Sequence, residues 1–291
     1  MFSGSITALI TPFANGQIDD AAFQRFVDWQ IKQGSNGLVP SGSTGESATL
    51  SHAEHERVIR LCVEATAKRV PVIAGTGSNS TSEAISLTKA AEVLGADAAL
   101  VVMPYYNKPS QEGLYQHYKA IHDACGLPII IYNIPGRSVV DMSIETMARL
   151  AKLPRIAGVK DATADLTRPT RMRHAIGPDF CQLSGEDPTI AAFLAQGGHG
   201  CISVTANVAP AACSALQAAW RAGDLKEMAK WRDLLTPLNA ALFHEVNPVP
   251  VKYAVSVLGF CEPSLRLPLI AASVETRMVV DEAMRFAGLV G

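Results

Sequence analysis

The sequence predicts an α/β fold, a (β/α)8 barrel of the TIM type followed by a C-terminal helical extension. Two observations lead to this prediction: short runs rich in Val, Ile, Leu and Ala recur eight times, and amphipathic segments of helical period separate them. Strand–helix units of roughly 20–35 residues are typical of such a barrel. A doubly wound sheet fits less well, since the first turn, TPFANGQ (11–17), lacks the glycine fingerprint of that fold.

The expected strands are continuously apolar rather than alternating, which is typical of parallel strands buried on both faces. They cover residues 5–10, 37–42, 71–77, 98–106, 128–135, 156–162, 181–187 and 200–206. A helix expected over 19–33 ends at Gly34, a residue type common just beyond helix C-termini. Ser51 and Glu54 form a capping-box pattern at the start of another helix. Further helices are expected over 82–94 and 187–196.

The barrel is expected to occupy residues 1–224 and the helical extension residues 225–291. After residue 225 the pattern is helical, and no further strand of similar strength follows. No linker rich in Gly, Ser or Pro precedes the extension, so we expect it to pack on the barrel rather than form a separate domain.

Composition places the chain among soluble globular proteins. Its 291 residues are 48% hydrophobic and 18% charged, with a formal net charge of -2, which gives no reason to expect nucleic acid or a membrane surface as a partner. No apolar run approaches the ~20 residues that span a bilayer, and the start has no signal-peptide pattern. The 6 cysteines are scattered without a C-x-x-C pair, so we expect reduced thiols and a cytoplasmic protein.

Polar side chains gather where the expected strands end, which is the catalytic end of such barrels. A purely structural explanation predicts no such bias toward one end, so the pattern favours an active site there. The residues are Ser43 and Thr44 after the second run, Tyr105 and Tyr106 closing the fourth, Tyr132 and Arg137 in and after the fifth, and Lys160 near the end of the sixth.

Lys160 follows the apolar residues 156–159 and has two interpretations. It is either a surface lysine with its head in water, or the nucleophile of a Schiff-base enzyme. Burial lowers the pKa of an amine, and the free amine is the form that attacks a carbonyl, so we favour the second. Imine formation moves protons, and Tyr132 on the adjacent strand is the candidate relay, although a packing role is equally open. Ser43 and Tyr106 would extend that relay.

Two groups are candidates for binding carboxylates. Residues 42–45, Gly-Ser-Thr-Gly, can present backbone N–H groups and hydroxyls to an anion, and no Gly-Lys-Ser/Thr follows that would make a phosphate loop. Arg137 suits a second carboxylate, with a solvated loop arginine as the alternative. His52 and His55 are three residues apart, whereas the helical zinc motif needs four, so no metal site is predicted.

Several motifs together carry a resemblance to a known family. The segments SGSTGESATLSHAEH (41–55), VVMPYYNKPSQEGLYQHYKAI (101–121), YNIPGRS (132–138), GVKDA (158–162) and NPVPVK (247–252) resemble the 4-hydroxy-tetrahydrodipicolinate (dihydrodipicolinate) synthases. The likeness runs essentially end to end. These enzymes belong to the pyruvate-dependent class I aldolases and lyases. The Tyr-Tyr pair and the arginine after YNIPG favour the synthases over the N-acetylneuraminate lyases and keto-deoxy-sugar-acid aldolases.

The resemblance implies a lyase that condenses pyruvate with L-aspartate 4-semialdehyde, the first committed step toward diaminopimelate and lysine. It implies an imine between Lys160 and pyruvate, with no other cofactor. Tyr132 would be the acid/base, and Ser43 and Tyr106 would complete the relay, Tyr106 reaching in from a neighbouring subunit. The implied substrate-binding residues are Thr44 for pyruvate, Arg137 for the semialdehyde, and Gly185 and Ile202 for the pocket wall.

Ser43 is a departure from the family pattern, because many members have threonine there. Serine keeps the hydroxyl but loses the β-methyl group that restricts χ1, so we expect a working relay with less fixed positioning.

A second set of residues matches the family's feedback site for L-lysine at a subunit interface. A carboxylate at Glu83 and histidine dipoles suit a cationic amino acid. The alternative is structural, since Glu83 also fits a capping box with Ser80. We favour inhibition by lysine, and the resemblance further implies a homotetramer, a dimer of dimers. The set comprises Ser47, Ala48, His52, His55, Asn79, Glu83 and Tyr105.

Two other functions remain open from the sequence. One is a related pyruvate-dependent aldolase acting on a sugar acid, which would share the lysine and the imine. The other is a non-catalytic barrel that binds a keto acid or an amino acid and forms no covalent adduct.

Overall fold

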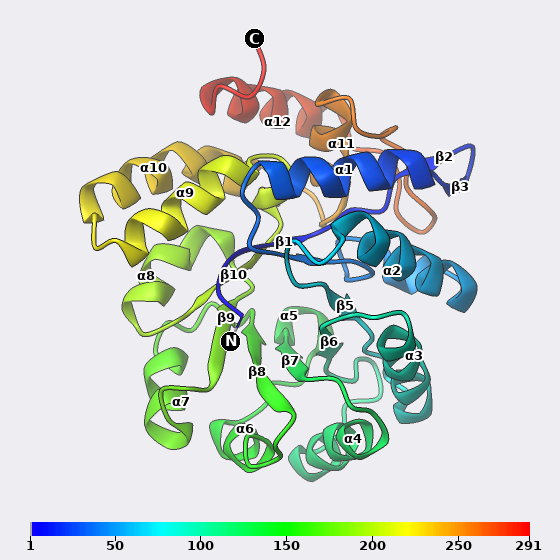
Figure 1. Ribbon diagram of the computed structural model, residues 1–291. Coiled ribbons are helices and arrows are strands. Elements are labelled where there is room, and N and C mark those ends of the chain that lie inside the picture. The colour runs from blue at the N-terminus through cyan, green and yellow to red at the C-terminus, as the bar shows by residue number, and fades with distance from the viewer. Residues whose placement is uncertain (1) are drawn as a thin grey trace.

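Eight parallel strands form the barrel in the computed structural model, which describes residues 2–291 (Figure 1). The sheet order is β4-β1-β10-β9-β8-β7-β6-β5, and a parallel bridge between Leu38 and Val72 joins its two ends. Each predicted strand is present, and each is shorter than its apolar run. The strands are β1 (Gly4–Ala8), β4 (Gly37–Val39), β5 (Ile73–Gly75), β6 (Ala98–Val102), β7 (Ile129–Asn133), β8 (Ile156–Asp161), β9 (Cys181–Ser184) and β10 (Gly200–Ser203).

Helices surround the strands, and α10, α11 and α12 lie together beside α1 and α9 at the top of Figure 1. The helices are α1 (Asp20–Lys32), α2 (His52–Thr66), α3 (Thr81–Val93), α4 (Gln111–Ala124), α5 (Pro135–Ser138), α6 (Ile144–Leu150), α7 (Arg168–Ile176), α8 (Ile190–Ala195), α9 (Pro210–Arg221), α10 (Leu225–Ala241), α11 (Val249–Val257) and α12 (Val274–Phe286). Short 3-10 turns are η1 (Ser47–Thr49), η2 (Asp187–Thr189) and η3 (Thr205–Asn207).

Helix ends follow the predicted capping chemistry. The Ser51 hydroxyl accepts the N–H of Glu54, and the Glu54 carboxylate accepts the N–H of Ser51, so the capping box at α2 is confirmed. Gly34 has a φ of 95°, which glycine adopts without strain, and it follows α1 as predicted.

The structure differs from the prediction in two places. A hairpin of two short strands, β2 (Phe13–Ala14) and β3 (Gln17–Ile18), follows β1, and its two-residue strands are too short for a periodic pattern to reveal. The helix predicted over 187–196 is divided into η2 and α8. The Asp187 carboxylate accepts the N–H groups of Val204 at 2.9 Å and Thr205 at 3.2 Å, so this turn is held by a distant loop.

Alternation along the strands decides which side chains fill the barrel. Ile130 and Tyr132 belong to the apolar cluster inside it, whereas Ile131 and Val159 belong to the cluster between strands and helices. Because successive strand side chains point to opposite faces, Lys160 points into the barrel at the carboxyl end of β8.

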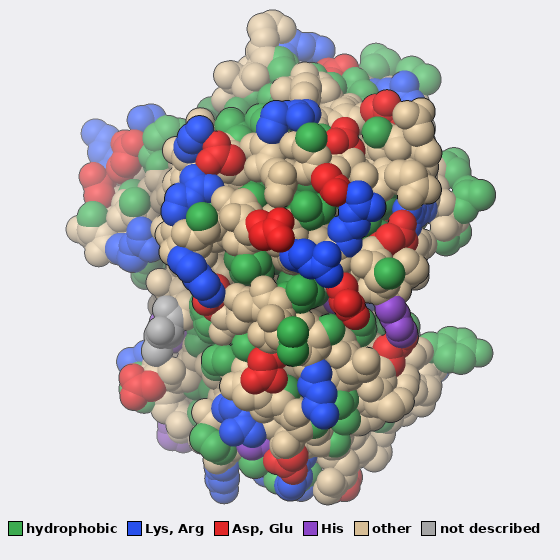
Figure 2. Space-filling view, turned by 45° about the vertical axis from the view of Figure 1, so that its right-hand side comes forward, with side chains coloured by type: hydrophobic (Ala, Val, Ile, Leu, Met, Phe, Trp, Pro, Cys, Tyr) green, Lys and Arg blue, Asp and Glu red, His purple; other side chains and the backbone are tan. Residues whose placement is uncertain are grey.

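The C-terminal helices bury their apolar faces against the barrel helices. Leu238 of α10, Val255 of α11 and Met284 of α12 share one cluster with Phe23 and Phe26 of α1. Within residues 2–291, no helix combines the length and hydropathy that crossing a bilayer requires. Basic and acidic side chains are interspersed over the face in Figure 2.

Candidate active site

Lys160 and Tyr132 lie side by side in the barrel. The parallel register of β7 and β8 pairs these residues directly, and the Lys160 Nζ lies 4.2 Å from the centroid of the Tyr132 ring. Lys160 is 6% exposed and Tyr132 is 7% exposed. The surface-lysine alternative is therefore wrong, and a primary amine is held in a largely dry site next to a phenol.

Two further predicted residues shape the space around this amine. A β-carbon on Gly185 would lie 2.7 Å from Ala162 Cβ and 3.1 Å from Lys160 Cε, so only glycine leaves room for the lysine side chain. Ile202 is fully buried on β10 and belongs to the same interior cluster as Tyr132.

A buried polar network outside the barrel wall holds the ends of β7 and β8. Asp161 and Asn133 are paired in register, next to Lys160 and Tyr132. The Arg168 Nε donates to the Asp161 carboxylate at 2.8 Å, and its Nη2 donates to the Met142 carbonyl at 2.9 Å. The Met142 N–H in turn donates to the Asn133 Oδ1 at 3.2 Å, so both strand ends are held, a contribution that the sequence pattern did not predict.

The loop after β4 presents Ser43 and Thr44. The Gly45 N–H donates to the Gly42 carbonyl at 3.0 Å and closes a tight turn. The Asn247 amide Nδ2 donates to the Thr44 hydroxyl oxygen at 3.1 Å. Because that oxygen accepts from Asn247, the Thr44 hydroxyl proton is free to be donated to an anion.

Asn247 also contacts Arg137, and our sequence reasoning assigned it no role. The Arg137 Nη2 donates to the Asn247 carbonyl at 2.8 Å, which orients one edge of the guanidinium. Ser43, Arg137 and Asn247 line one cavity of about 560 Å³. The two predicted carboxylate-binding groups thus face the same space, and the NPVPVK motif was the available signal for Asn247.

Most of the second predicted set lines this same cavity. The members along it are Ser47, Ala48, His52, His55, Glu83 and Tyr105. Asn79 is not among the residues that line the cavity. Its backbone carbonyl accepts a hydrogen bond from the Asn107 side chain at 2.9 Å.

Glu83 lies on the cavity wall and is held by two neighbouring side chains. The Ser78 hydroxyl donates to one oxygen of the Glu83 carboxylate, and the His52 Nε2 lies 2.7 Å from the other oxygen. Both contacts lower the pKa of the Glu83 carboxyl. Ser80 accepts the N–H of Glu83, but the carboxylate turns to Ser78 and His52, so only half of the capping-box alternative is realised.

His55 is held as a neutral acceptor. Its Nε2 donates to the Gly75 carbonyl at 2.8 Å, so Nδ1 carries a lone pair. That buried Nδ1 has no hydrogen-bond partner within residues 2–291, and burial lowers the pKa of the ring.

Tyr106 lies on the surface of its own chain. It is 87% exposed, and its φ of 73° lies in the left-handed region, which is unusual for a residue with a large side chain. The structure therefore does not bring Tyr106 together with Tyr132 and Ser43 within one chain.

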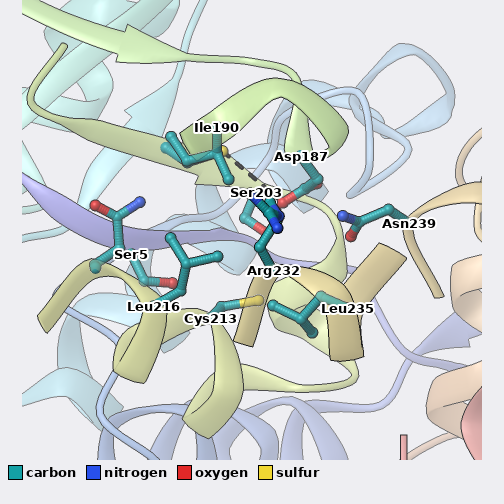
Figure 3. Close-up of a pocket in the computed structure, with 11 residues that line it drawn as sticks. Ser5, Asp187, Ile190, Ser203, Cys213, Leu216, Arg232, Leu235 and Asn239 are labelled. Carbon is teal, nitrogen blue, oxygen red and sulfur yellow. Dashed lines mark hydrogen bonds between the residues drawn. The ribbon is translucent and has the colours of Figure 1, made fainter. Parts of the chain in front are cut away.

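A second, much smaller cavity of about 20 Å³ lies on the outer side of β10, with Asp187, Ser203, Arg232 and Asn239 around it (Figure 3). The Ser203 hydroxyl donates to the Asp187 carboxylate. The space suits a single water molecule, and no predicted site residue reaches it. Within residues 2–291, no group of three or more His, Cys, Asp or Glu side chains is arranged to hold a metal ion.

Comparison with known proteins identifies the family. Residues 1–286 match the profile of the Dihydrodipicolinate synthetase family. The chain is 70% identical over 289 residues to the 4-hydroxy-tetrahydrodipicolinate synthase of Rhodospirillum centenum, covering 99% of each chain.

Solved structures agree with this match. The chloride-inhibited dihydrodipicolinate synthase of Acinetobacter baumannii complexed with pyruvate is 46% identical, with a TM-score of 0.97 and 100% of each chain covered. The enzyme of Cyanidioschyzon merolae with lysine bound is 37% identical, with a TM-score of 0.96 and 99% of each chain covered. The chain therefore belongs to the dihydrodipicolinate synthetase family and is a lyase.

Proposed function

We propose that the protein condenses pyruvate with L-aspartate 4-semialdehyde to give 4-hydroxy-tetrahydrodipicolinate, in the route to diaminopimelate and lysine. The observation that carries this proposal is the buried Lys160 amine beside the Tyr132 phenol. It is supported by Thr44 and Arg137, the two candidate carboxylate-binding residues, which both contact Asn247. The relative from Acinetobacter baumannii, complexed with pyruvate, supports the same first substrate.

The chemistry follows from these groups. The Lys160 amine attacks the ketone carbon of pyruvate, and water leaves to give an imine. Loss of a methyl proton then gives an enamine, whose carbon bonds to the aldehyde carbon of the semialdehyde. The amine of the semialdehyde then attacks the imine carbon and displaces the Lys160 amine, which closes the ring of the product and regenerates the free lysine. Tyr132 moves the protons, with Ser43 and a neighbouring subunit's Tyr106 as the relay. The imine itself stabilises the carbanion, so no other cofactor is proposed.

The pocket residues divide the two substrates between them. Thr44 binds the carboxylate of pyruvate with its free hydroxyl proton, and Arg137 binds the carboxylate of the semialdehyde. Gly185 and Ile202 leave space around the imine. We also propose a cytoplasmic location, since all six cysteines are free and five of them are buried.

Turnover with different acceptors tests this assignment. Purified protein is supplied with pyruvate and either L-aspartate 4-semialdehyde or aldose acceptors, and product formation is followed. We expect turnover with the semialdehyde alone. Turnover with aldoses instead would identify a sugar-acid aldolase, and consumption of neither acceptor would leave a keto-acid-binding barrel.

We propose L-lysine as a feedback inhibitor bound by Ser47, Ala48, His52, His55, Asn79, Glu83 and Tyr105. The charged Glu83 carboxylate on the cavity wall favours a cationic ligand. The relative from Cyanidioschyzon merolae has lysine bound, which supports the same ligand here.

Inhibition assays test this second site. Millimolar L-lysine should slow the wild-type enzyme, and Glu83→Gln should weaken inhibition roughly tenfold, the effect of losing one charge-assisted contact. Glu64→Gln, an exposed change on α2, is the matched control. Unchanged wild-type turnover in lysine would contradict the site.

A further inference from the structure

An ion pair is buried directly beneath the loop that carries Ser43 and Thr44. Glu46, at the end of that loop, is 4% exposed, and Lys252 of α11 is 0% exposed. The Lys252 Nζ donates to the Glu46 Oε1, and the backbone N–H of Arg266 donates to Oε2 at 3.0 Å. The C-terminal extension therefore holds both oxygens of one carboxylate in the catalytic half of the barrel.

The surroundings make this pair costly to bury. The Lys252 Nζ lies 4.0 Å from the centroid of the Phe13 ring, and burial lowers the pKa of the amine. The other charged groups nearby are Arg266, over the same ring, and Glu54, which binds the Arg266 guanidinium. Buried ion pairs are often no more stabilising than apolar residues of similar size, so fold stability alone is a weak reason for this one.

Glu46 occupies the position that determines the shape of the loop. Its backbone is left-handed, with φ of 57° and ψ of 35°, and it starts η1. Its N–H donates to the Ser43 carbonyl at 3.2 Å, while the Ser47 N–H donates to the Gly42 carbonyl at 3.3 Å. Moving the Glu46 side chain would therefore displace the turn that aims the Ser43 and Thr44 hydroxyls.

We propose that the Lys252–Glu46 pair is a positioning device that holds residues 43–47 in the conformation that binds the carboxylate of pyruvate. The inference rests on the proposed use of pyruvate as first substrate. It assigns to the C-terminal extension a role in substrate affinity in addition to its packing on the barrel.

Three variants test this role: Lys252→Met, Glu46→Gln, and the double variant. Lys252→Met leaves a buried carboxylate without its counter-charge, so it should lose stability and pyruvate affinity together. The double variant removes both charges at similar volume and should recover most of the stability. Its pyruvate KM should nevertheless remain roughly tenfold above that of the wild type, because no ion pair holds the loop. Its KM for the semialdehyde should be unchanged.

The readout is separable from the overall reaction. Pyruvate affinity is measured as the pyruvate dependence of the amount of borohydride-trapped adduct, followed by mass, which needs no second substrate. Wild-type protein that forms this adduct but does not turn over the semialdehyde would overturn the proposed function and leave this test valid. Lys230→Met/Glu227→Gln, which removes an exposed pair on α10, is the control and should bind pyruvate normally. A double variant with wild-type stability and wild-type pyruvate affinity would overturn the positioning role.

Discussion

At the scale of single residues, the site depends on how closely the chain approaches the Lys160 amine. Gly185 follows β9, and a side chain there would meet both Ala162 and Lys160 Cε. Overpacking of this kind costs about 1–3 kcal/mol. The space that glycine leaves is therefore part of the environment of the Lys160 side chain.

Gly185→Ala should slow imine formation with pyruvate by about tenfold or more, since a cost of about 1.4 kcal/mol in the transition state is tenfold in rate. The measurement is the rate of borohydride-trapped adduct formation. Gly136→Ala on the same rim, where a β-carbon meets nothing within 4 Å, is the control and should react like wild type. Equal rates for Gly185→Ala and wild type would contradict the crowding argument.

Residues were predictable when their signal was local. Lys160 and Tyr132 lie near the ends of apolar strands, and parallel register brings them together, so strand position was sufficient to predict their placement. Asn247 and Lys252 act through partners 203 and 206 residues away in the chain, and no local pattern encodes such contacts. Only the motif NPVPVK marked them, without indicating what they touch.

At the scale of elements, each predicted strand is present because continuous apolar runs describe buried parallel strands well. The prediction was less successful where tertiary contacts override local preference, as at η2, where Asp187 binds backbone N–H groups after β10. The docking of the extension likewise depends on tertiary contacts. The Arg266 guanidinium donates to the two carboxylate oxygens of Glu54 on α2, at 2.8 Å and 2.5 Å.

The Arg266–Glu54 pair should make stability depend on pH. The Arg266 guanidinium lowers the pKa of Glu54 from 4.5 to about 2, and the Glu54 side chain is 22% exposed. A carboxyl with a lowered folded-state pKa stabilises the fold above its unfolded pKa and loses that effect as the pH falls toward 2. The free energy of unfolding of the wild type should exceed that of Glu54→Gln by about 1–2 kcal/mol at pH 7. This difference in stability should become smaller below pH 4.5.

Denaturant unfolding at several pH values measures this gap. Glu112→Gln removes an exposed partner of Arg149 and should change stability by less than about 0.5 kcal/mol. If the difference in stability between wild type and Glu54→Gln is the same at pH 7 and pH 3, the Arg266–Glu54 ion pair does not anchor the extension.

At the scale of the whole molecule, the proposed relay would link catalysis to assembly through Tyr106. It is exposed on its own chain, so the relay that we propose is complete only when another chain supplies this residue. The predicted homotetramer provides a means of doing so, with each site borrowing a phenol from its neighbour.

Mixed subunits test this arrangement. Lys160→Ala chains have no nucleophile but carry Tyr106, and Tyr106→Phe chains have the nucleophile but lack the phenol. Each variant alone should be slow, and subunits exchanged between the two should recover part of the wild-type kcat, because some sites combine Lys160 with a neighbour's Tyr106. Mixtures that show only the sum of the separate activities would contradict relay across the interface.

The most direct test of the central claim is borohydride reduction in the presence of pyruvate, followed by mass analysis of the lysine-containing peptides. Lys252 is an internal comparison, because it is also buried but paired with Glu46. We predict loss of activity, with one pyruvate-derived addition on Lys160 and none on Lys252. An unmodified Lys160 in protein that has been inactivated, or full activity after reduction, would contradict the account.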